Sequence, residues 1–206
     1  MKLLLTSEGL TTEAIQQKFL SLVGKPAHEI TVAFIPTAAG TEEDASWIEF
    51  NKQPLDNLGV KTVDDIDLRE YAGEALYDQL SKYDVIWVNG GNTFYLMYWI
   101  RRSGFDSVIR RLLAEGKMYV GVSAGSIVTG PSIEVASWKG YDDPSVVELA
   151  DYSGLGLVPF QIFAHYGPEW QQLVDEHRAS LKDNLMLLTD EQAIAIGKTA
   201  DPQVQN

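Results

Sequence analysis

A serine between two glycines is the residue of this sequence best suited to covalent catalysis. Residues 121–125 read G-V-S-A-G, so Ser123 lies at the centre of a G-x-S-x-G pattern. The apolar run 118–122 is typical of a buried strand, and residues 126–129 are typical of a short helix. A sharp turn from strand to helix exposes the serine hydroxyl, and the free N–H groups at the helix start favour negative charge nearby. The pattern therefore predicts Ser123 as a nucleophile.

A serine nucleophile needs a base within hydrogen-bond reach, and the sequence offers three histidines. His165 follows the apolar stretch 160–164 and precedes a Gly-Pro break one residue later, so it is expected at the end of a strand. His177 lies on a charged helical segment, where exposure to solvent explains it, and His28 lies in a loop. We predict His165 as the base.

The base in turn needs a carboxylate that orients it, and several acids are candidates for this role. Glu191 follows the predicted strand 185–189 and can reach His165 across adjacent strand ends. Asp142 and Asp143 lie in a loop further upstream and are the alternatives. We expect Glu191 in this role and leave the pair Asp142 and Asp143 open.

A glycine pair, Gly90 and Gly91, ends the predicted strand 85–89 and precedes an amphipathic segment, 93–102. Two glycines let the backbone adopt a positive φ or approach a ligand closely. A plain strand-to-helix turn with Asn92 as the helix cap explains the pair equally well. The chain has no P-loop pattern, and no G-x-G-x-x-G follows its first strand, so nucleotide binding is not indicated.

Strand-length apolar runs alternate with segments of helical periodicity along the 206 residues. Two of these runs, 84–88 and 118–122, are mostly apolar at consecutive positions, as strands buried on both faces of a parallel sheet are. The alternation predicts an α/β fold with a doubly wound, mostly parallel sheet flanked by helices, and residues 1–206 as one domain. The expected strands are 2–6, 30–35, 60–68, 85–89, 118–122, 185–189 and 193–197; the expected helices are 12–23, 45–58, 73–81, 93–102, 107–115 and 168–181.

Composition and charge exclude several classes of function. The formal net charge of −13 repels phosphate backbones, so nucleic-acid binding is disfavoured. The absence of cysteine excludes disulfides, a cysteine nucleophile and thiolate metal sites, and a total of three histidines disfavours a histidine-rich metal centre. No apolar stretch approaches the roughly 18–20 residues of a membrane span, and the N-terminal run is too short for a signal peptide. We expect no membrane partner and a cytoplasmic location.

Taken together, the motifs resemble those of a known family. The segments G-G-N-T-F at 90–94, G-V-S-A-G-S at 121–126 and A-H-Y at 164–166 are similar to those of the aspartyl dipeptidase (dipeptidase E) family of serine peptidases, which is related to cyanophycinase. The resemblance runs along nearly the whole chain, from the first strand to Glu191. It implies a flavodoxin-like fold related to that of class I glutamine amidotransferases, with serine in place of their cysteine.

The resemblance also implies roles for individual residues. Ser123 would be the nucleophile and His165 the general base, with the backbone N–H groups of Gly91 and Ala124 as the oxyanion hole. No metal or organic cofactor is implied. The implied substrates are small peptides, which in dipeptidase E carry an N-terminal aspartate.

Two features depart from the pattern of dipeptidase E. In the segment after Pro131, where that family carries an acid, an alignment without gaps places Trp138. The arginine expected to hold an N-terminal aspartate side chain has no counterpart here, since Arg178 matches only by residue type. The other arginines considered, Arg101, Arg102, Arg110 and Arg111, fall on helical segments whose solvated faces explain them.

We therefore expect a serine-type hydrolase that cleaves dipeptides or short peptides, with preference for N-terminal aspartate left open. One alternative is an acyl esterase that uses the same serine turn. The other is a non-catalytic binding or sensing domain of the same fold, which Trp138 would favour. Ser123, His165 and the two glycine turns together favour an enzyme, because a binding domain needs none of them. The oligomeric state is left open.

Overall fold

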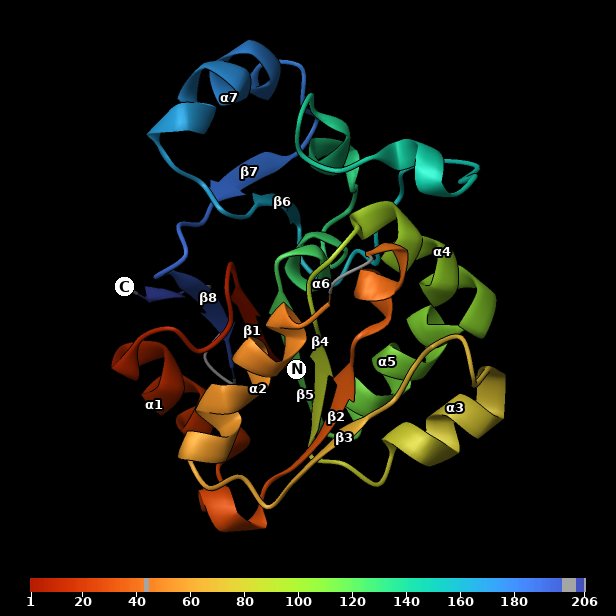
Figure 1. The fold of residues 1–206 in the computed structure, drawn as a ribbon, viewed down its shortest axis with the longest axis vertical. Coiled ribbons are helices and arrows are strands. Elements are labelled where there is room, and N and C mark those ends of the chain that lie inside the picture. Colours follow the sequence, from red (N-terminus) through yellow and green to blue (C-terminus); the bar gives the residue numbers. More distant parts are fainter. Residues whose placement is uncertain (43–44, 198–202, 206) are drawn as a thin grey trace.

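A twisted central sheet organises the molecule (Figure 1). The computed structural model describes residues 1–42, 45–197 and 203–205. The seven strands of the central sheet lie in the order β3-β2-β4-β5-β1-β8-β9. All neighbouring pairs are parallel except β1–β8 and β8–β9. The strands are β1 (Lys2–Thr6), β2 (Thr31–Ile35), β3 (Thr62–Asp65), β4 (Val85–Val88), β5 (Met118–Val122), β8 (Ala193–Ile196) and β9 (Gln203–Gln205). The predicted α/β fold with a mostly parallel sheet flanked by helices is confirmed.

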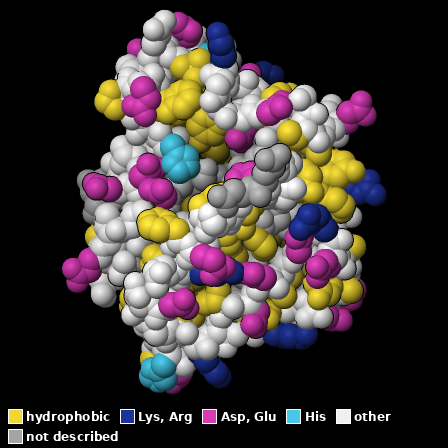
Figure 2. Space-filling view, in the orientation of Figure 1, with side chains coloured by type: hydrophobic (Ala, Val, Ile, Leu, Met, Phe, Trp, Pro, Cys, Tyr) yellow, Lys and Arg dark blue, Asp and Glu magenta, His cyan; other side chains and the backbone are white. Residues whose placement is uncertain are grey.

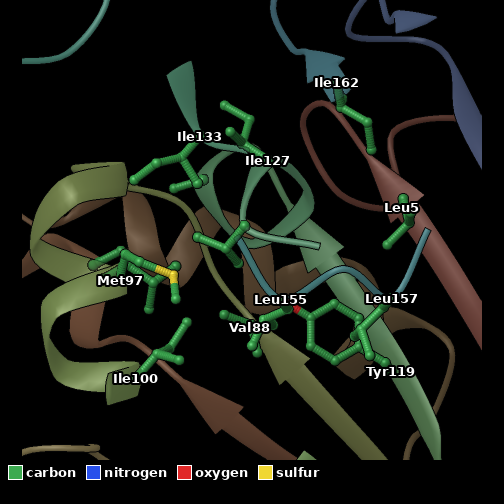
Figure 3. Close-up of a cluster of buried hydrophobic side chains, with 14 of the residues drawn as sticks. Leu5, Val88, Met97, Ile100, Tyr119, Ile127, Ile133, Leu155, Leu157 and Ile162 are labelled. Carbon is green, nitrogen blue, oxygen red and sulfur yellow. The ribbon is translucent and has the colours of Figure 1, made fainter. Parts of the chain in front are cut away.

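Helices cover both faces of this sheet because its inner strands are apolar on both sides. One face packs against α1 (Glu13–Val23) and α2 (Trp47–Asn57), around the buried rings of Phe19, Phe34 and Trp87. The other face packs against α3 (Gly73–Leu80), α4 (Thr93–Ser103), α5 (Phe105–Ala114) and the short α6 (Ala124–Ile127). Figure 3 shows this second core, where side chains from strands, helices and the 155–157 loop interdigitate. Among the described helices, none is long and apolar enough to cross a bilayer.

A second, two-stranded sheet lies at one end of the molecule together with α7 (Gln171–Arg178) (Figure 1). It pairs β6 (Phe160–Phe163) in parallel with β7 (Asn184–Leu187). The sequence places residues 185–189 in the main sheet, and this expectation is wrong because β7 pairs with β6 instead. The predicted helix 168–181 divides into a 3-10 turn at Pro168–Trp170 followed by α7.

The predicted strand 60–68 is much shorter in the structure. β3 lies at the edge of the sheet and pairs only with β2, over four residues from Thr62 to Asp65. Beyond Asp65, the N–H of Ile66 still donates to the carbonyl of Phe34 at 2.8 Å, and the side chains of Ile66 and Leu68 join the hydrophobic core. Their burial explains why the apolar pattern continues beyond the end of the strand.

Candidate active site

The turn from β5 to α6 carries Ser123 in a strained backbone conformation, with φ 48° and ψ −112°. The flanking glycines are required by close backbone packing. A Cβ at Gly121 would lie 2.6 Å from the carbonyl oxygen of Gly125, and a Cβ at Gly125 would lie 2.0 Å from that of Val88. The G-x-S-x-G pattern therefore reflects a turn that only glycine permits on either side of the serine.

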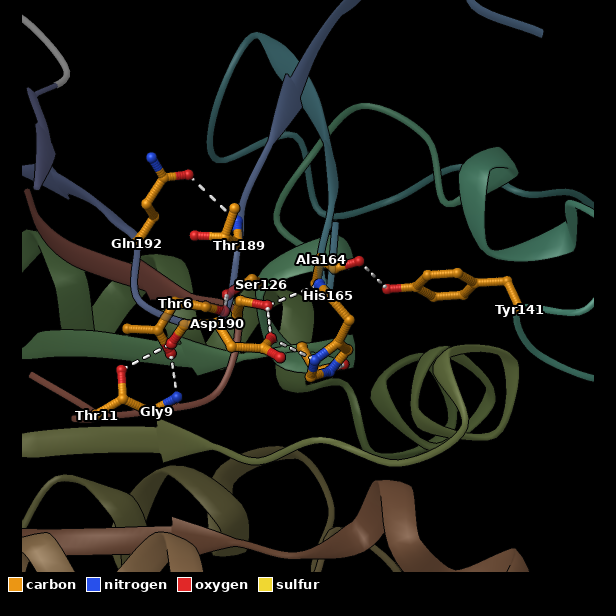
Figure 4. Close-up of polar contacts among 12 residues, drawn as sticks. Thr6, Gly9, Thr11, Ser126, Tyr141, Ala164, His165, Thr189, Asp190 and Gln192 are labelled. Carbon is orange, nitrogen blue, oxygen red and sulfur yellow. Dashed lines mark hydrogen bonds and ion pairs between the residues drawn. The ribbon is translucent and has the colours of Figure 1, made fainter. Parts of the chain in front are cut away.

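The end of β1 holds this turn in place. The hydroxyl of Thr6 donates to the carbonyl of Gly121 at 2.9 Å, and the hydroxyl of Ser126 donates to the carbonyl of Thr6 at 2.7 Å (Figure 4). The backbone N–H of Ser123 also donates to the carbonyl of Thr6, at 3.1 Å. Thr6 and Ser126 are fully buried, so these bonds form out of contact with water and fix the position of Ser123.

His165 reaches the same edge from the small sheet. Beyond the last pair of the β6–β7 ladder, the N–H of Leu188 donates to Phe163 and that of Tyr166 donates to Leu188, each at 2.9 Å. This extended pairing brings His165 beside the chain that follows β7. Its φ is 53°, and among the non-glycine residues described, only His165 and Ser123 have a positive φ. Such strain is concentrated at functional sites, because elsewhere it only destabilises the fold.

A chain of hydrogen bonds connects Ser123, His165 and Asp190. The Oγ of Ser123 lies 3.0 Å from Nε2 of His165, and Nδ1 of the same ring lies 2.7 Å from Oδ1 of Asp190 (Figure 4). With the ring proton on Nδ1, the imidazole donates to Asp190, and Nε2 accepts the hydrogen of the serine hydroxyl. This is the arrangement in which a histidine can remove a proton from a serine.

The acid beside the imidazole is Asp190 rather than the predicted Glu191, so that assignment is corrected by one residue. The N–H of Gln192 donates to the carbonyl of Thr189 at 3.0 Å, which places Asp190 and Glu191 at the corners of a tight turn. Asp190 points inward, where its Oδ1 also accepts from the hydroxyl of Ser7 at 2.7 Å. Glu191 is exposed at the tip of the turn.

The alternative acids, Asp142 and Asp143, lie near the site without contacting the imidazole. Oδ2 of Asp142 accepts from the backbone N–H of Thr93, the first residue of α4, at 2.9 Å. Asp143 accepts from the N–H and the hydroxyl of Ser145. Burial raises the pKa of Asp142, and the charge of Glu42 adds to the increase, while the hydrogen bonds from Thr93 partly offset it.

The glycine pair lies directly against the serine. A Cβ at Gly90 would be 3.2 Å from the Cβ of Ser123, and one at Gly91, where φ is 125°, would be 2.4 Å from the carbonyl oxygen of Ala38. Asn92 caps α4 by accepting from the N–H of Tyr95. Ala124 is the first residue of α6, so its N–H has no acceptor within the helix.

A cavity of about 600 Å³ opens over these residues. It lies at the carboxyl ends of the parallel strands, where open α/β sheets bind their ligands. Its lining, within the part of the chain that the structure describes, consists of Ser7, Glu8, Thr41, Glu42, Trp47, Phe50, Asn51, Gly90, Gly91, Asn92, Val122, Ser123, Gly140, Tyr141, Asp142, Asp143, Val146, His165 and Trp170. Figure 2 shows carboxylate side chains spread over this view of the surface, in keeping with the net charge of −13.

Two contacts near the imidazole were not foreseen from the sequence. Buried Ser7 accepts from the backbone N–H of His165 at 2.7 Å while it donates to Asp190, so it links the two. The hydroxyl of Tyr141 donates to the carbonyl of Ala164 at 3.1 Å from the other side (Figure 4). A buried serine directly after an apolar strand is a weak signal that such a contact exists, whereas nothing local marks Tyr141.

Trp138 and His177 have structural positions. Trp138 is only 4% exposed and packs against the ring of Phe163. The ring of His177 stacks on that of Trp138, with 5.0 Å between the ring centroids. The expectation that His177 is simply solvated is therefore incomplete. Among the described residues, no group of three or more histidine, aspartate or glutamate side chains is arranged to hold a metal ion.

The fold and the comparisons with known proteins define a class, the peptidases. Residues 3–201 match the model of peptidase family S51, and the chain belongs to that family. It is 36% identical to an uncharacterized peptidase of Listeria innocua, Lin0382, over 82% of this chain and 87% of that protein.

Two further relatives carry the name peptidase E. The peptidase E of Nostoc is 32% identical over 73% of this chain, which spans 57% of that longer protein. A crystal structure of a protein assigned as peptidase E from Listeria monocytogenes EGD-e superposes with a TM-score of 0.84, at 28% identity, over 100% of this chain and 98% of the other. These relatives confirm the resemblance to the dipeptidase E family.

Proposed function

We propose that this member of family S51 is a serine peptidase that hydrolyses dipeptides or other short peptides. The observation that carries the proposal is the hydrogen-bonded chain from Ser123 through His165 to Asp190. A serine hydroxyl is a weak nucleophile at neutral pH, and an adjacent imidazole oriented by a carboxylate is the usual means of activating it.

In the proposed mechanism, Oγ of Ser123 attacks the carbonyl carbon of the peptide bond while Nε2 of His165 takes the hydroxyl proton. Asp190 stabilises the imidazolium that forms, and the N–H groups of Gly91 and Ala124 donate to the oxyanion. The imidazolium then protonates the leaving amine as the C–N bond breaks. Water, deprotonated by the same imidazole, releases the acyl group from Ser123.

The size of the cavity supports a short substrate. Its volume of about 600 Å³ lies within the range typical of small-ligand pockets, roughly 300–1,000 Å³. A dipeptide or tripeptide fits such a space, whereas a folded protein chain does not enter it. An acyl esterase and a non-catalytic binding domain are the alternatives. Unlike the proposed peptidase, neither of them is expected to cleave peptides in an assay.

The test compares the protein with its Ser123→Ala variant on a mixed dipeptide and tripeptide library, with the products followed by mass spectrometry. We expect cleavage by the protein and a loss on the order of 10⁴-fold or more in the variant. A fluorophosphonate probe should label Ser123 in the protein and leave the variant unlabelled. Peptide cleavage that survives in Ser123→Ala, or a protein that neither cleaves nor is labelled, would contradict the proposal.

A further inference from the structure

The lining of the cavity is acidic. Four carboxylates contribute to it, from Glu8, Glu42, Asp142 and Asp143, and no lysine or arginine is among the described residues that line it. Each arginine considered from the sequence has a contact elsewhere: Arg101 with Asp151, Arg102 with Tyr98, Arg110 with the carbonyl of Leu155, Arg111 with Glu74, and Arg178 with the carbonyl of Leu185. Nothing in this lining can neutralise the side chain of a substrate aspartate.

Asp142 is the carboxylate best placed to bind a cation. Its Oδ2 is fixed by the N–H of Thr93, directly after the glycine turn, and the amide of Asn92 donates to the backbone carbonyl of Asp143 at 3.0 Å. The loop is thereby tied to the start of α4. Among the described residues, no lysine or arginine pairs with Asp142, although its side chain is partly buried. A partly buried carboxylate without a cationic partner gains stability from a positively charged ligand.

Asp142 and Glu8 both lie close enough to His165 to interact with its charge. Burial raises the pKa of Glu8, the charge of Asp190 raises it further, and His165 lowers it. The charge of His165 likewise lowers the pKa of Asp142, against the larger effect of burial. Both carboxylates therefore lie near the imidazole that Ser123 contacts, where a further carboxylate from the substrate would be repelled.

The rim of the cavity is apolar. Phe50 is 65% exposed and Val146 is 38% exposed, and both line the cavity beside Trp47 and Trp170. Large hydrophobic side chains at the surface around a concave site commonly contact a ligand. This surface suits an uncharged, apolar side chain of the substrate.

We infer that this peptidase selects short peptides with a free, protonated α-amine and a neutral or basic first residue, and that Asp142 binds the α-ammonium group. The inference rests on the proposed function and names its substrate class. The α-amine of a dipeptide is separated from the scissile carbonyl by a single carbon atom. A carboxylate that lines the same cavity as the nucleophile therefore selects cleavage after the first residue, and the apolar rim accommodates the second. N-terminal aspartate is disfavoured.

The test measures kcat and KM for four substrates: Ala-Leu, Lys-Leu, Asp-Leu and N-acetyl-Ala-Leu. We expect Ala-Leu and Lys-Leu to be cleaved, with kcat/KM for Asp-Leu and N-acetyl-Ala-Leu lower by about tenfold or more, the factor set by one charged hydrogen bond. The variant Asp142→Asn should raise KM for Ala-Leu by about tenfold to a hundredfold with little change in kcat. The same substitution should leave N-acetyl-Ala-Leu nearly unaffected and reduce the disadvantage of Asp-Leu.

A matched control is Asp151→Asn, which also removes an aspartate that accepts from a backbone N–H, at a site outside the cavity. We expect it to leave all four substrates unchanged. Preference for Asp-Leu or for the acetylated peptide, or an Asp142→Asn variant that changes all substrates equally, would overturn the inference while Ser123-dependent cleavage still upheld the proposed function. If none of the four peptides is cleaved, the inference fails. If in addition no library peptide is cleaved and Ser123 is not labelled, or if cleavage does not need Ser123, the proposed function fails as well.

Discussion

Asp84, at the amino end of the parallel strands, and Asp142 and Glu8, at the carboxyl end, differ in how their charges are compensated. At the amino end, Asp84 precedes β4 and accepts from the ammonium group of Lys25 at 2.5 Å and from the N–H and the hydroxyl of Thr31, each at 3.2 Å. Burial acts to raise the pKa of Asp84, but these donors outweigh it and lower the pKa. At the carboxyl end, the pKa values of Asp142 and Glu8 are raised, because burial there is not balanced by enough donors.

Backbone conformation follows the same division. Ser123 and His165, the two described non-glycine residues with positive φ, are both at the carboxyl end. At the amino end the charge of Asp84 is paired with Lys25, whereas the carboxyl end combines strained backbone with Asp142 and Glu8, neither of which pairs with a described lysine or arginine. A natural fold departs from its own local rules chiefly where it binds or reacts, so the comparison itself identifies the functional end of the sheet.

The largest effect expected at the carboxyl end is on catalysis. Replacing Asp190 by asparagine removes the negative charge that orients His165 and stabilises its protonated form. We expect kcat to fall by about 10³- to 10⁴-fold, as carboxylate-to-amide changes do in serine–histidine–aspartate sites. Steady-state kinetics on a peptide that the protein cleaves would measure this loss, and circular dichroism would check that the fold is unchanged.

The neighbouring residue provides the control for this variant. Glu191→Gln removes the same charge one position away, on an exposed side chain, and should change kcat by less than about twofold, as surface substitutions usually do. An equal loss in both variants, or a larger loss in Glu191→Gln, would show that the acid was assigned to the wrong residue of the turn.

A smaller effect, on stability, is expected at the amino end. Asp84→Asn removes a paired charge and should lower the free energy of unfolding at pH 7 by about 2 kcal/mol, the usual size for hydrogen bonds to a charged group. Because the pKa of Asp84 is lowered in the folded state, its contribution is complete above the ordinary aspartate pKa of about 4 and is lost as the pH falls through the lowered value. The difference between protein and variant should therefore shrink under acid conditions, as urea unfolding at several pH values would measure.

In the same experiment, Asp142→Asn should change the free energy of unfolding at pH 7 in the opposite direction to Asp84→Asn. Since the pKa of Asp142 is raised, its ionised form destabilises the folded state above that pKa, and the penalty disappears below the pKa of the unfolded chain. The variant should be more stable than the protein at pH 7 and no more stable in acid. If both variants change stability in the same direction at pH 7, the contrast between the two ends of the sheet is wrong.

The parts of the site that depend on local backbone could be predicted from the sequence. Gly121 and Gly125 leave a clear pattern because no side chain fits on either side of Ser123. His165 follows an apolar strand and precedes a chain break, so its place at a strand end is also visible. The same local signals give six of the seven strands of the main sheet, all but β9, and most of its helices.

The parts that depend on contacts between distant segments could not be predicted. Asp190 faces the imidazole and accepts from Ser7, which lies directly after the first strand, and the sequence around Glu191 carries no local signal of that contact. The pairing of β7 with β6 instead of the main sheet has the same origin. A strand's apolar pattern reveals that it is buried, but does not specify which strand pairs with it.

The smallest predicted effect concerns the strain at Ser123. Glycine adopts a φ of 48° without penalty, whereas alanine retains the strain of the native residue. Release of strain of about 1–3 kcal/mol exceeds the added entropy of glycine in the unfolded chain, about 0.4–1 kcal/mol, so Ser123→Gly should be more stable than Ser123→Ala by about 1 kcal/mol. Thermal and urea unfolding of the two inactive variants would measure the difference. A glycine variant less stable than the alanine variant would mean that the turn is relaxed, and that strain at the carboxyl end of the sheet is not part of what distinguishes it from the amino end.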